Sequence, residues 1–191
     1  MIRALVFDCF GVVLTDALQE LRAELALRDV MAAEEVRDIV AANNRGLIAP
    51  HESNQRLASI FGMPTEVFRA KIAAGEVRNE QLLQYIGGLR KHYKTAMLSN
   101  IAGSSLARRF PDEELSLYFD EVLASADIGY MKPDKEAYEI AAERLGVELN
   151  ECIFIDDREA FCAAAKAAGM QAILYTDFAQ FTKDLEALLS M

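Results

Sequence analysis

Residues 4–14, with the sequence ALVFDCFGVVL, constrain the fold of this chain more than any other stretch. A run of four apolar residues is typical of a strand in a parallel sheet that is covered on both faces. The run ends in Asp8, and open α/β sheets bind their ligands at the carboxyl ends of such strands. Gly11 allows the sharp turn that must follow. These residues alone leave open whether Asp8 is a solvated strand end or a functional group.

The remainder of the chain alternates between short apolar runs and amphipathic segments. We predict further strands at residues 94–99, 121–124, 151–155 and 171–175. The expected helices between and after them are residues 80–91, 104–110, 134–145, 160–168 and 178–189. Strands that alternate with helices form a parallel sheet with right-handed crossovers. The predicted fold class is therefore α/β, with a doubly wound parallel sheet.

Residues 15–89 follow a different pattern, with apolar residues at helical spacing and no candidate strand. Gly46 and Pro50 interrupt the helical pattern, so we expect several short helices here. The expected organisation is a core formed by residues 1–14 and 90–191, with a small all-helical cap at residues 15–89. In this interpretation the cap is inserted directly after the first strand.

The composition limits the possible partners. The 191 residues include 20 basic and 30 acidic side chains, a formal net charge of −10. We expect neither nucleic acid nor a membrane as partner, because both would need a basic surface patch. A small anionic substrate is compatible with this charge, since a metal ion can reverse the local field. Three cysteines without CxxC spacing and no signal-peptide pattern lead us to expect a cytoplasmic protein with reduced thiols.

Polar side chains stand at the ends of three predicted strands. Asp8, Ser99 and the pair Asp156-Asp157 should meet at one edge of the sheet, because parallel strands point in the same direction. Adjacent carboxylates are costly unless a cation compensates them, and Mg²⁺ prefers one or two carboxylates together with phosphate oxygens. We favour a metal site over a solvated turn at Asp156-Asp157 when Asp8 lies beside it.

Other candidates lie outside the strand ends. Lys132 is in the loop GYMKPD, and its charge would steady both Asp8 and a transferring phosphoryl group if it reached the cluster. In the helical segment, Arg45, His51 and Arg56 are candidates to meet the substrate, although a solvated position on a helix surface is the commoner role for each.

Four segments resemble, in order, the motifs of the haloacid dehalogenase-like hydrolase superfamily. They are FDCFGVVL at residues 7–14, LSN at 98–100, GYMKPD at 129–134 and FIDD at 154–157. The resemblance extends over essentially the whole chain and implies a Rossmann-like core. The stretch RGLI at residues 45–48 resembles part of the small cap in one branch of that superfamily. That branch includes sugar-1-phosphate phosphatases and the N-terminal phosphatase domain of soluble epoxide hydrolases.

The resemblance implies a Mg²⁺-dependent phosphatase that acts on a small phosphorylated substrate, possibly a sugar phosphate, and is a monomer or a homodimer. Asp8 would be the nucleophile that forms an aspartyl-phosphate. The Mg²⁺ ligands would be Asp8, the backbone carbonyl of Phe10, and Asp157, with Asp156 nearby or bound through water.

The resemblance also implies a set of groups for the substrate. Ser99 would hydrogen-bond a phosphoryl oxygen, and Asn100 would support its loop. Lys132 would hold both the nucleophile and the phosphate, which suits a reaction that depends mainly on positioning and charge neutralisation. Arg45 is not assigned by the resemblance; from its place in the helical lobe, we expect it to contact the substrate.

The sequence departs from the family pattern at Phe10. Most phosphatases of the superfamily carry a second Asp there, which protonates the leaving group, and losing such an acid typically costs about 10²–10⁴-fold in rate. Two alternatives therefore stay open. A metal-free 2-haloacid dehalogenase would have an aromatic residue at this position, but it should not gather extra carboxylates such as Asp156-Asp157. A catalytically weak binding or regulatory protein could keep the same fold.

Overall fold

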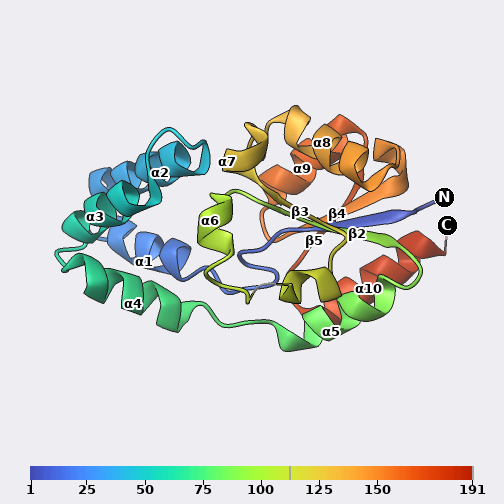
Figure 1. Ribbon diagram of the computed structural model, residues 1–191, viewed down its shortest axis with the longest axis horizontal. Coiled ribbons are helices and arrows are strands. Elements are labelled where there is room, and N and C mark those ends of the chain that lie inside the picture. The colour runs from blue at the N-terminus through green and yellow to red at the C-terminus, as the bar shows by residue number, and fades with distance from the viewer. Residues whose placement is uncertain (112, 191) are drawn as a thin grey trace.

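Five parallel strands form the sheet at the centre of the molecule, in the order β3-β2-β1-β4-β5 (Figure 1). The strands are β1 (Ala4–Phe7), β2 (Lys94–Ser99), β3 (Glu121–Ala124), β4 (Cys152–Asp156) and β5 (Gln171–Leu174). This fold comes from a computed structural model that describes residues 1–111 and 113–190. Every pairing in the sheet is parallel, which confirms the predicted α/β class.

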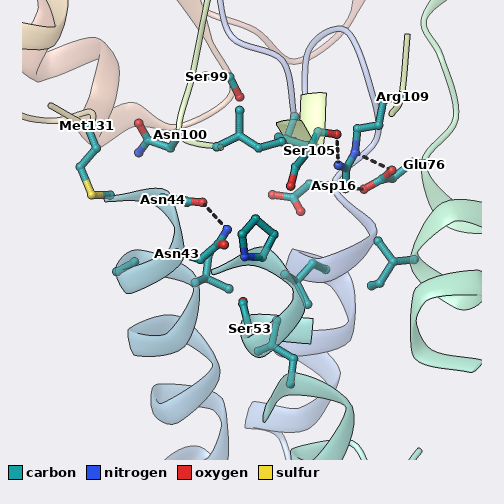
Figure 2. A pocket seen from close by; sticks show the side chains of 18 of the residues that line it. Asp16, Asn43, Asn44, Ser53, Glu76, Ser99, Asn100, Ser105, Arg109 and Met131 are labelled. Atoms are coloured by element: carbon teal, nitrogen blue, oxygen red, sulfur yellow. Dashed lines mark hydrogen bonds and ion pairs between the residues drawn. The ribbon is translucent and has the colours of Figure 1, made fainter. Parts of the chain in front are cut away.

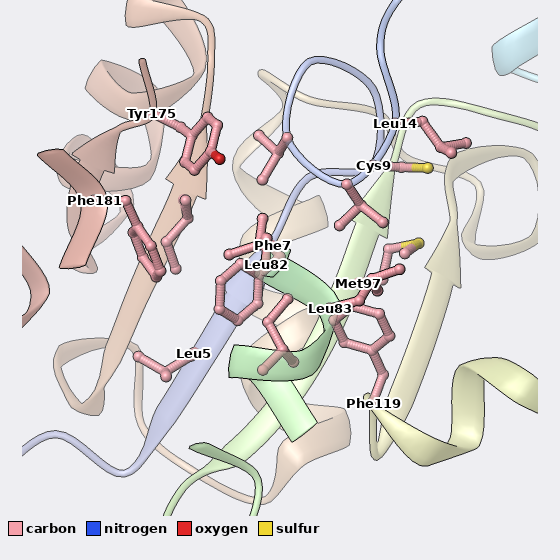
Figure 3. Close-up of a cluster of buried hydrophobic side chains, with 14 of the residues drawn as sticks. Leu5, Phe7, Cys9, Leu14, Leu82, Leu83, Met97, Phe119, Tyr175 and Phe181 are labelled. Atoms are coloured by element: carbon pink, nitrogen blue, oxygen red, sulfur yellow. The ribbon is translucent and has the colours of Figure 1, made fainter. Parts of the chain in front are cut away.

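Two layers of helices cover the sheet because the side chains of a strand alternate between its faces. On one face, Leu5 and Phe7 pack with α5 (Glu80–Leu89) and α10 (Phe178–Leu189) in the cluster drawn in Figure 3. On the other face, Ala4 and Val6 pack with α8 (Lys135–Leu145) and α9 (Glu159–Ala168). The central strand is fully buried on both faces, as its unbroken apolar run predicts.

Four helices form a separate lobe, at the left of Figure 1. They are α1 (Ala17–Ala26), α2 (Val30–Asn44), α3 (Pro50–Ile60) and α4 (Thr65–Gly75). The lobe has its own hydrophobic cluster, in which Val36, Leu57 and Phe68 are almost completely buried. We call this lobe, residues 17–75, the cap.

The following helix, α5, buries Leu82, Leu83 and Ile86 in the cluster beneath the sheet rather than in the cap. The boundaries between core and cap that we expect from the sequence, at residues 14/15 and 89/90, stay a prediction.

The segment after β2 differs from its prediction. A helix was expected over residues 104–110, but α6 extends only from Gly103 to Leu106 and is followed by turns. Pro111 makes Phe110 unfavourable as a helical residue, but it does not account for the end of the helix at Leu106. Short elements complete the fold: the 3₁₀ helices η1 (Glu114–Leu117) and η2 (Leu149–Glu151), and α7 (Ser125–Ile128).

Two further observations concern the length of the helices and the state of the cysteines. Among the described residues, no helix is long and apolar enough to cross a membrane. Cys9, Cys152 and Cys162 are all buried and form no disulfide.

Candidate active site

The predicted polar groups meet at the carboxyl edge of the sheet. Asp8 directly follows β1, while Ser99 and Asp156 are the last residues of the two strands that pair with β1. All three are buried. Lys132 enters from the loop between α7 and α8, and its side chain is also fully buried.

Lys132 lies between two carboxylates. Its Nζ atom is 2.7 Å from Asp8 Oδ1 and 2.7 Å from Asp156 Oδ2. The rings of Phe154 and Phe161 lie against the ammonium, each with its centroid 5.3 Å from Nζ. Burial alone would lower the pKa of Lys132, but the two carboxylates outweigh it and raise this pKa above its ordinary value. The side chain is therefore held as a cation.

The carboxylates carry more negative charge than Lys132 neutralises. One oxygen each from Asp8, Asp156 and Asp157 lies within 4.8 Å of the others. Burial raises the pKa of Asp8 to about 7, with the charge of Asp156 adding to the effect and Lys132 opposing it. Burial and Asp156 likewise raise the pKa of Asp157 to about 6. A divalent cation among these oxygens would relieve the repulsion that these shifts reflect.

Asp157 gives a second indication that the carboxylate cluster needs a further partner. Its Oδ1 atom is buried and accepts no hydrogen bond from the residues that the structure describes. A buried carboxylate oxygen without a partner is costly, and a hard cation such as Mg²⁺ is a suitable partner for it. The residues present therefore fit Mg²⁺, with Asp8 and Asp157 as the carboxylates that would hold it.

Gly11 lies against this cluster. Its φ of +84° is in the left-handed region, and a Cβ atom at this position would lie 2.2 Å from Asp157 Oδ2. Only glycine fits here without displacing the carboxylate. On the other side of the turn, Asp8 Oδ1 accepts a 2.6 Å hydrogen bond from the Cys9 amide, which fixes the orientation of the carboxylate.

Ser99 and Asn100 have different surroundings. The Ser99 hydroxyl is buried and has no hydrogen-bond partner among the described residues, so it is available to a ligand. Asn100 is occupied: its Nδ2 donates to the carbonyl of Lys132, and its Oδ1 accepts from the Lys132 amide, both at 2.8 Å. Asn100 thus holds the backbone that carries the lysine.

A cavity of about 260 Å³ opens above these groups, between the sheet edge and the cap. From the core it is lined by Asp8, Phe10, Ser99 and Lys132, among others. Asp157 is not among its lining residues and instead borders a second, more open hollow. The cluster thus lies at the junction of the two spaces.

Three of the predicted cap residues lie elsewhere. Arg45, His51 and Arg56 are not among the described residues that line the cavity. The guanidinium of Arg45 is half exposed, with Nη2 3.9 Å from a carboxylate oxygen of Asp134 and Nε 3.0 Å from Met131 Sδ. Arg45 therefore links the cap to the core loop that carries Lys132 and does not line the cavity itself.

The surroundings of Phe10 were not foreseen. The guanidinium of Arg109 lies over the Phe10 ring, with Cζ 5.1 Å from the centroid. Arg109 also forms a two-point ion pair with Glu76, at 2.6 and 2.8 Å, and donates to the Ser105 carbonyl (Figure 2). Glu76 and Arg109 are far apart in the sequence and share no motif, so no local signal could have paired them.

Other groups that line the cavity were also missed. Asp16 caps α1 through the Gln19 amide and accepts a 3.2 Å hydrogen bond from Arg158. On the cap side, the cavity is lined by Asn43, Asn44, Ser53 and Asn54. In the sequence, Asn43 and Asn44 could have been noticed because they lie at the end of a predicted helix, close to Gly46, which interrupts the helical pattern.

The sequence profile of the haloacid dehalogenase-like hydrolases matches residues 2–169. The chain therefore belongs to the haloacid dehalogenase-like hydrolase family, as its motifs predict. Among curated proteins, it is 30% identical over 152 residues to a sesquiterpene phosphatase of Aspergillus oryzae, a match that covers 76% of each chain. It is also 30% identical over 127 residues to the bifunctional epoxide hydrolase 2 of Rattus norvegicus. That match covers 64% of this chain but only 23% of the rat protein.

Solved structures agree on the fold. A predicted HAD-like family hydrolase from Porphyromonas gingivalis superposes with a TM-score of 0.76 at 25% identity, covering 100% of this chain and 99% of that one. A HAD family enzyme from Bacteroides thetaiotaomicron, in complex with magnesium and inorganic phosphate, superposes with a TM-score of 0.73. It is 21% identical, and the match covers 95% of this chain and 99% of that chain. A likeness at this identity concerns the fold alone.

Proposed function

We propose that this protein is a Mg²⁺-dependent phosphatase that hydrolyses a small phosphorylated metabolite through an aspartyl-phosphate on Asp8. One observation carries the proposal: Lys132 Nζ bridges Asp8 and Asp156 at 2.7 Å each, beside a third carboxylate. This arrangement suits attack by a carboxylate on an anionic phosphate, because both reactants are negative and need nearby cations. The similarity to a sesquiterpene phosphatase supports the reaction class.

The steps follow from the positions of the side chains. A carboxylate oxygen of Asp8 attacks phosphorus, the P–O bond to the leaving group breaks, and an aspartyl-phosphate results. Water then attacks phosphorus, the bond to Asp8 breaks, and inorganic phosphate leaves. Lys132 would hold the nucleophile in place, and the free Ser99 hydroxyl would donate to a phosphoryl oxygen. Mg²⁺ bound at Asp8, Asp157 and the Phe10 carbonyl would supply the remaining positive charge.

Phe10 restricts the leaving group. Its ring has no proton to give, so a leaving group that is stable as an anion would react best. Arg109 over the ring is no replacement acid, because a guanidinium keeps its proton in proteins. We therefore expect aryl, acyl or sugar-1-phosphates to be better substrates than simple alkyl phosphates.

Phe10 also favours one alternative, a metal-free 2-haloacid dehalogenase, in which Asp8 would attack carbon and halide would leave without a proton. The cluster of Asp8, Asp156 and Asp157 counts against it, since a metal-free site for a carboxylate substrate gains nothing from extra carboxylates.

The test is hydrolysis of p-nitrophenyl phosphate, whose leaving group needs little protonation. We expect turnover with Mg²⁺ that is abolished by EDTA and by Asp8→Asn. The matched control is Asp184→Asn, on α10, where an amide can still accept the hydrogen bond that Gln180 donates. Turnover that persists in EDTA and in Asp8→Asn would refute the mechanism. Release of halide from a 2-haloacid without Mg²⁺ would favour the dehalogenase.

A further inference from the structure

Four neutral polar side chains of the cap face the catalytic edge across the cavity. Asn43 and Asn44 are the last residues of α2, and Ser53 and Asn54 lie in the early turns of α3. Figure 2 shows the first three on the wall opposite Ser99. We call these four residues the amide wall.

The amide wall has unused hydrogen-bonding capacity. Asn43 Oδ1 is buried and accepts no hydrogen bond from the described residues. The Nδ2 atom of the same side chain reaches only Asn44 Oδ1, at a long 3.5 Å. The side chains of Ser53 and Asn54 also form no hydrogen bond within the described part of the chain, but among the four residues only Asn43 has a fully buried polar atom without a partner. Buried polar groups normally have partners, so a ligand is the natural partner here.

Most of the charges around the cavity are, in contrast, paired; the exception is Arg108, an exposed residue that donates to the Ser104 carbonyl and the Ser105 hydroxyl and has no ion pair among the described residues. Arg109 is neutralised by Glu76 and Arg158 by Asp16. Arg37 pairs with two acidic neighbours of its own helix. Except at Arg108, a second anionic group on the substrate would have to compete with these carboxylates. A hydroxyl group would not compete with them, because it carries no charge and both donates and accepts hydrogen bonds, as an amide side chain does.

We propose that the amide wall determines specificity by binding the hydroxyl groups of a neutral, polyhydroxylated leaving group. The phosphoryl group would occupy the edge at Asp8 and Ser99, and the hydroxyl-bearing body would extend toward Asn43 and Asn54. This inference rests on the proposed phosphatase function and adds the substrate class and the residues that read it. It also gives a role to the amide side chains that line the cavity beside the apolar Leu57 and Phe68.

The experiment compares two substrates, a hexose 1-phosphate and p-nitrophenyl phosphate, in the presence of Mg²⁺. The variants are Asn43→Leu and Asn54→Leu, which preserve approximate size and remove the hydrogen bonds. For each variant, kcat/KM on the hexose phosphate should fall roughly 2- to 12-fold, the factor that corresponds to one neutral hydrogen bond. On p-nitrophenyl phosphate, whose leaving group has no hydroxyl groups to bind, the loss should be clearly smaller, and an unchanged circular dichroism spectrum and thermal midpoint show that each variant folds.

The control is Asn150→Leu, at an exposed asparagine in η2, which should change neither substrate. Equal losses on both substrates, or no loss on the hexose phosphate, would overturn the inference. So would a preference for esters with a second acidic group that is lost in Arg108→Ala, since Arg108 also lines the cavity. Absence of p-nitrophenyl phosphate turnover in the unmodified protein would instead refute the phosphatase proposal itself.

Discussion

Replacing Lys132 by methionine tests the electrostatics of the site most directly. Methionine has nearly the same length and no charge, so Lys132→Met removes the ammonium and leaves the packing largely intact. Asp8 and Asp156 would each lose an ion pair of 2.7 Å in a fully buried position. Both carboxylates would then remain without their compensating cation.

The expected loss of stability is large. Removing one partner of a buried ion pair typically costs about 3–5 kcal/mol, because the other charge stays buried and uncompensated. Lys132 serves two carboxylates, so we expect at least the lower end of this range at pH 7.5. The loss should shrink toward pH 5, where Asp8 takes up a proton, since its pKa is already raised to about 7 with the lysine present. In urea, about 3–5 kcal/mol corresponds to a midpoint shift of roughly 1.5–2.5 M.

The assay is urea unfolding of the metal-free protein at pH 7.5 and pH 5, followed by circular dichroism. The control is Lys135→Met, since this exposed lysine pairs with Glu139 on the surface of α8 and its loss should leave the midpoint unchanged. A second variant covers the case in which Lys132→Met does not fold. The double variant Lys132→Met/Asp156→Asn removes one of the two stranded charges and should be more stable than the single variant.

Two results would refute this reasoning. One is a Lys132→Met protein whose free energy of unfolding at pH 7.5 lies within about 1 kcal/mol of that of the unmodified protein. Such a difference is well below the cost of an uncompensated buried charge. The other is a double variant that is less stable than Lys132→Met, which would mean that the carboxylates do not repel one another.

Further predictions concern the leaving group, the turn and the metal. Phe10→Asp should raise the rate on alkyl phosphates, by at most the roughly 10²–10⁴-fold that a general acid contributes. Gly11→Ala should weaken Mg²⁺ binding because its Cβ would displace Asp157; Gly62→Ala, also at positive φ but with open space around it, should not. Raised pKa values mean that the folded metal-free protein binds more protons than the unfolded chain between about pH 4 and 7, so its stability should fall as the pH rises. Mg²⁺ should accordingly stabilise the protein more at pH 8 than at pH 5.5, where protons compete for Asp8 and Asp157.

Each of these predictions would be contradicted by a specific result. Activity of Phe10→Asp that stays confined to aryl phosphates would show that the ring does not limit the range of substrates. Equal Mg²⁺ affinities of Gly11→Ala and the unmodified protein, measured by calorimetry, would separate the turn from the metal site. Thermal stabilisation by Mg²⁺ that is the same at both pH values would mean that no proton competes with the ion.

The family and the gathering of polar groups at one edge of the sheet could be predicted from the sequence because both depend on local patterns. Apolar runs that alternate with amphipathic segments indicate a parallel sheet, and a parallel sheet brings the ends of its strands to one edge. Asp8, Ser99 and Asp156 therefore had to lie together once their strands were recognised. Lys132 could be placed only through its motif, since a lysine in a loop is usually solvated.

The tertiary structure alone decided what surrounds these groups across the cavity. The ion pair of Glu76 with Arg109, the position of Arg109 over Phe10 and the unpartnered amide of Asn43 all join segments that no local pattern relates. Such contacts depend on how the cap packs against the sheet, and side-chain periodicity fixes only which face of a helix is buried. For the same reason the sequence could not show that Asn43, and not Arg45, lines the cavity.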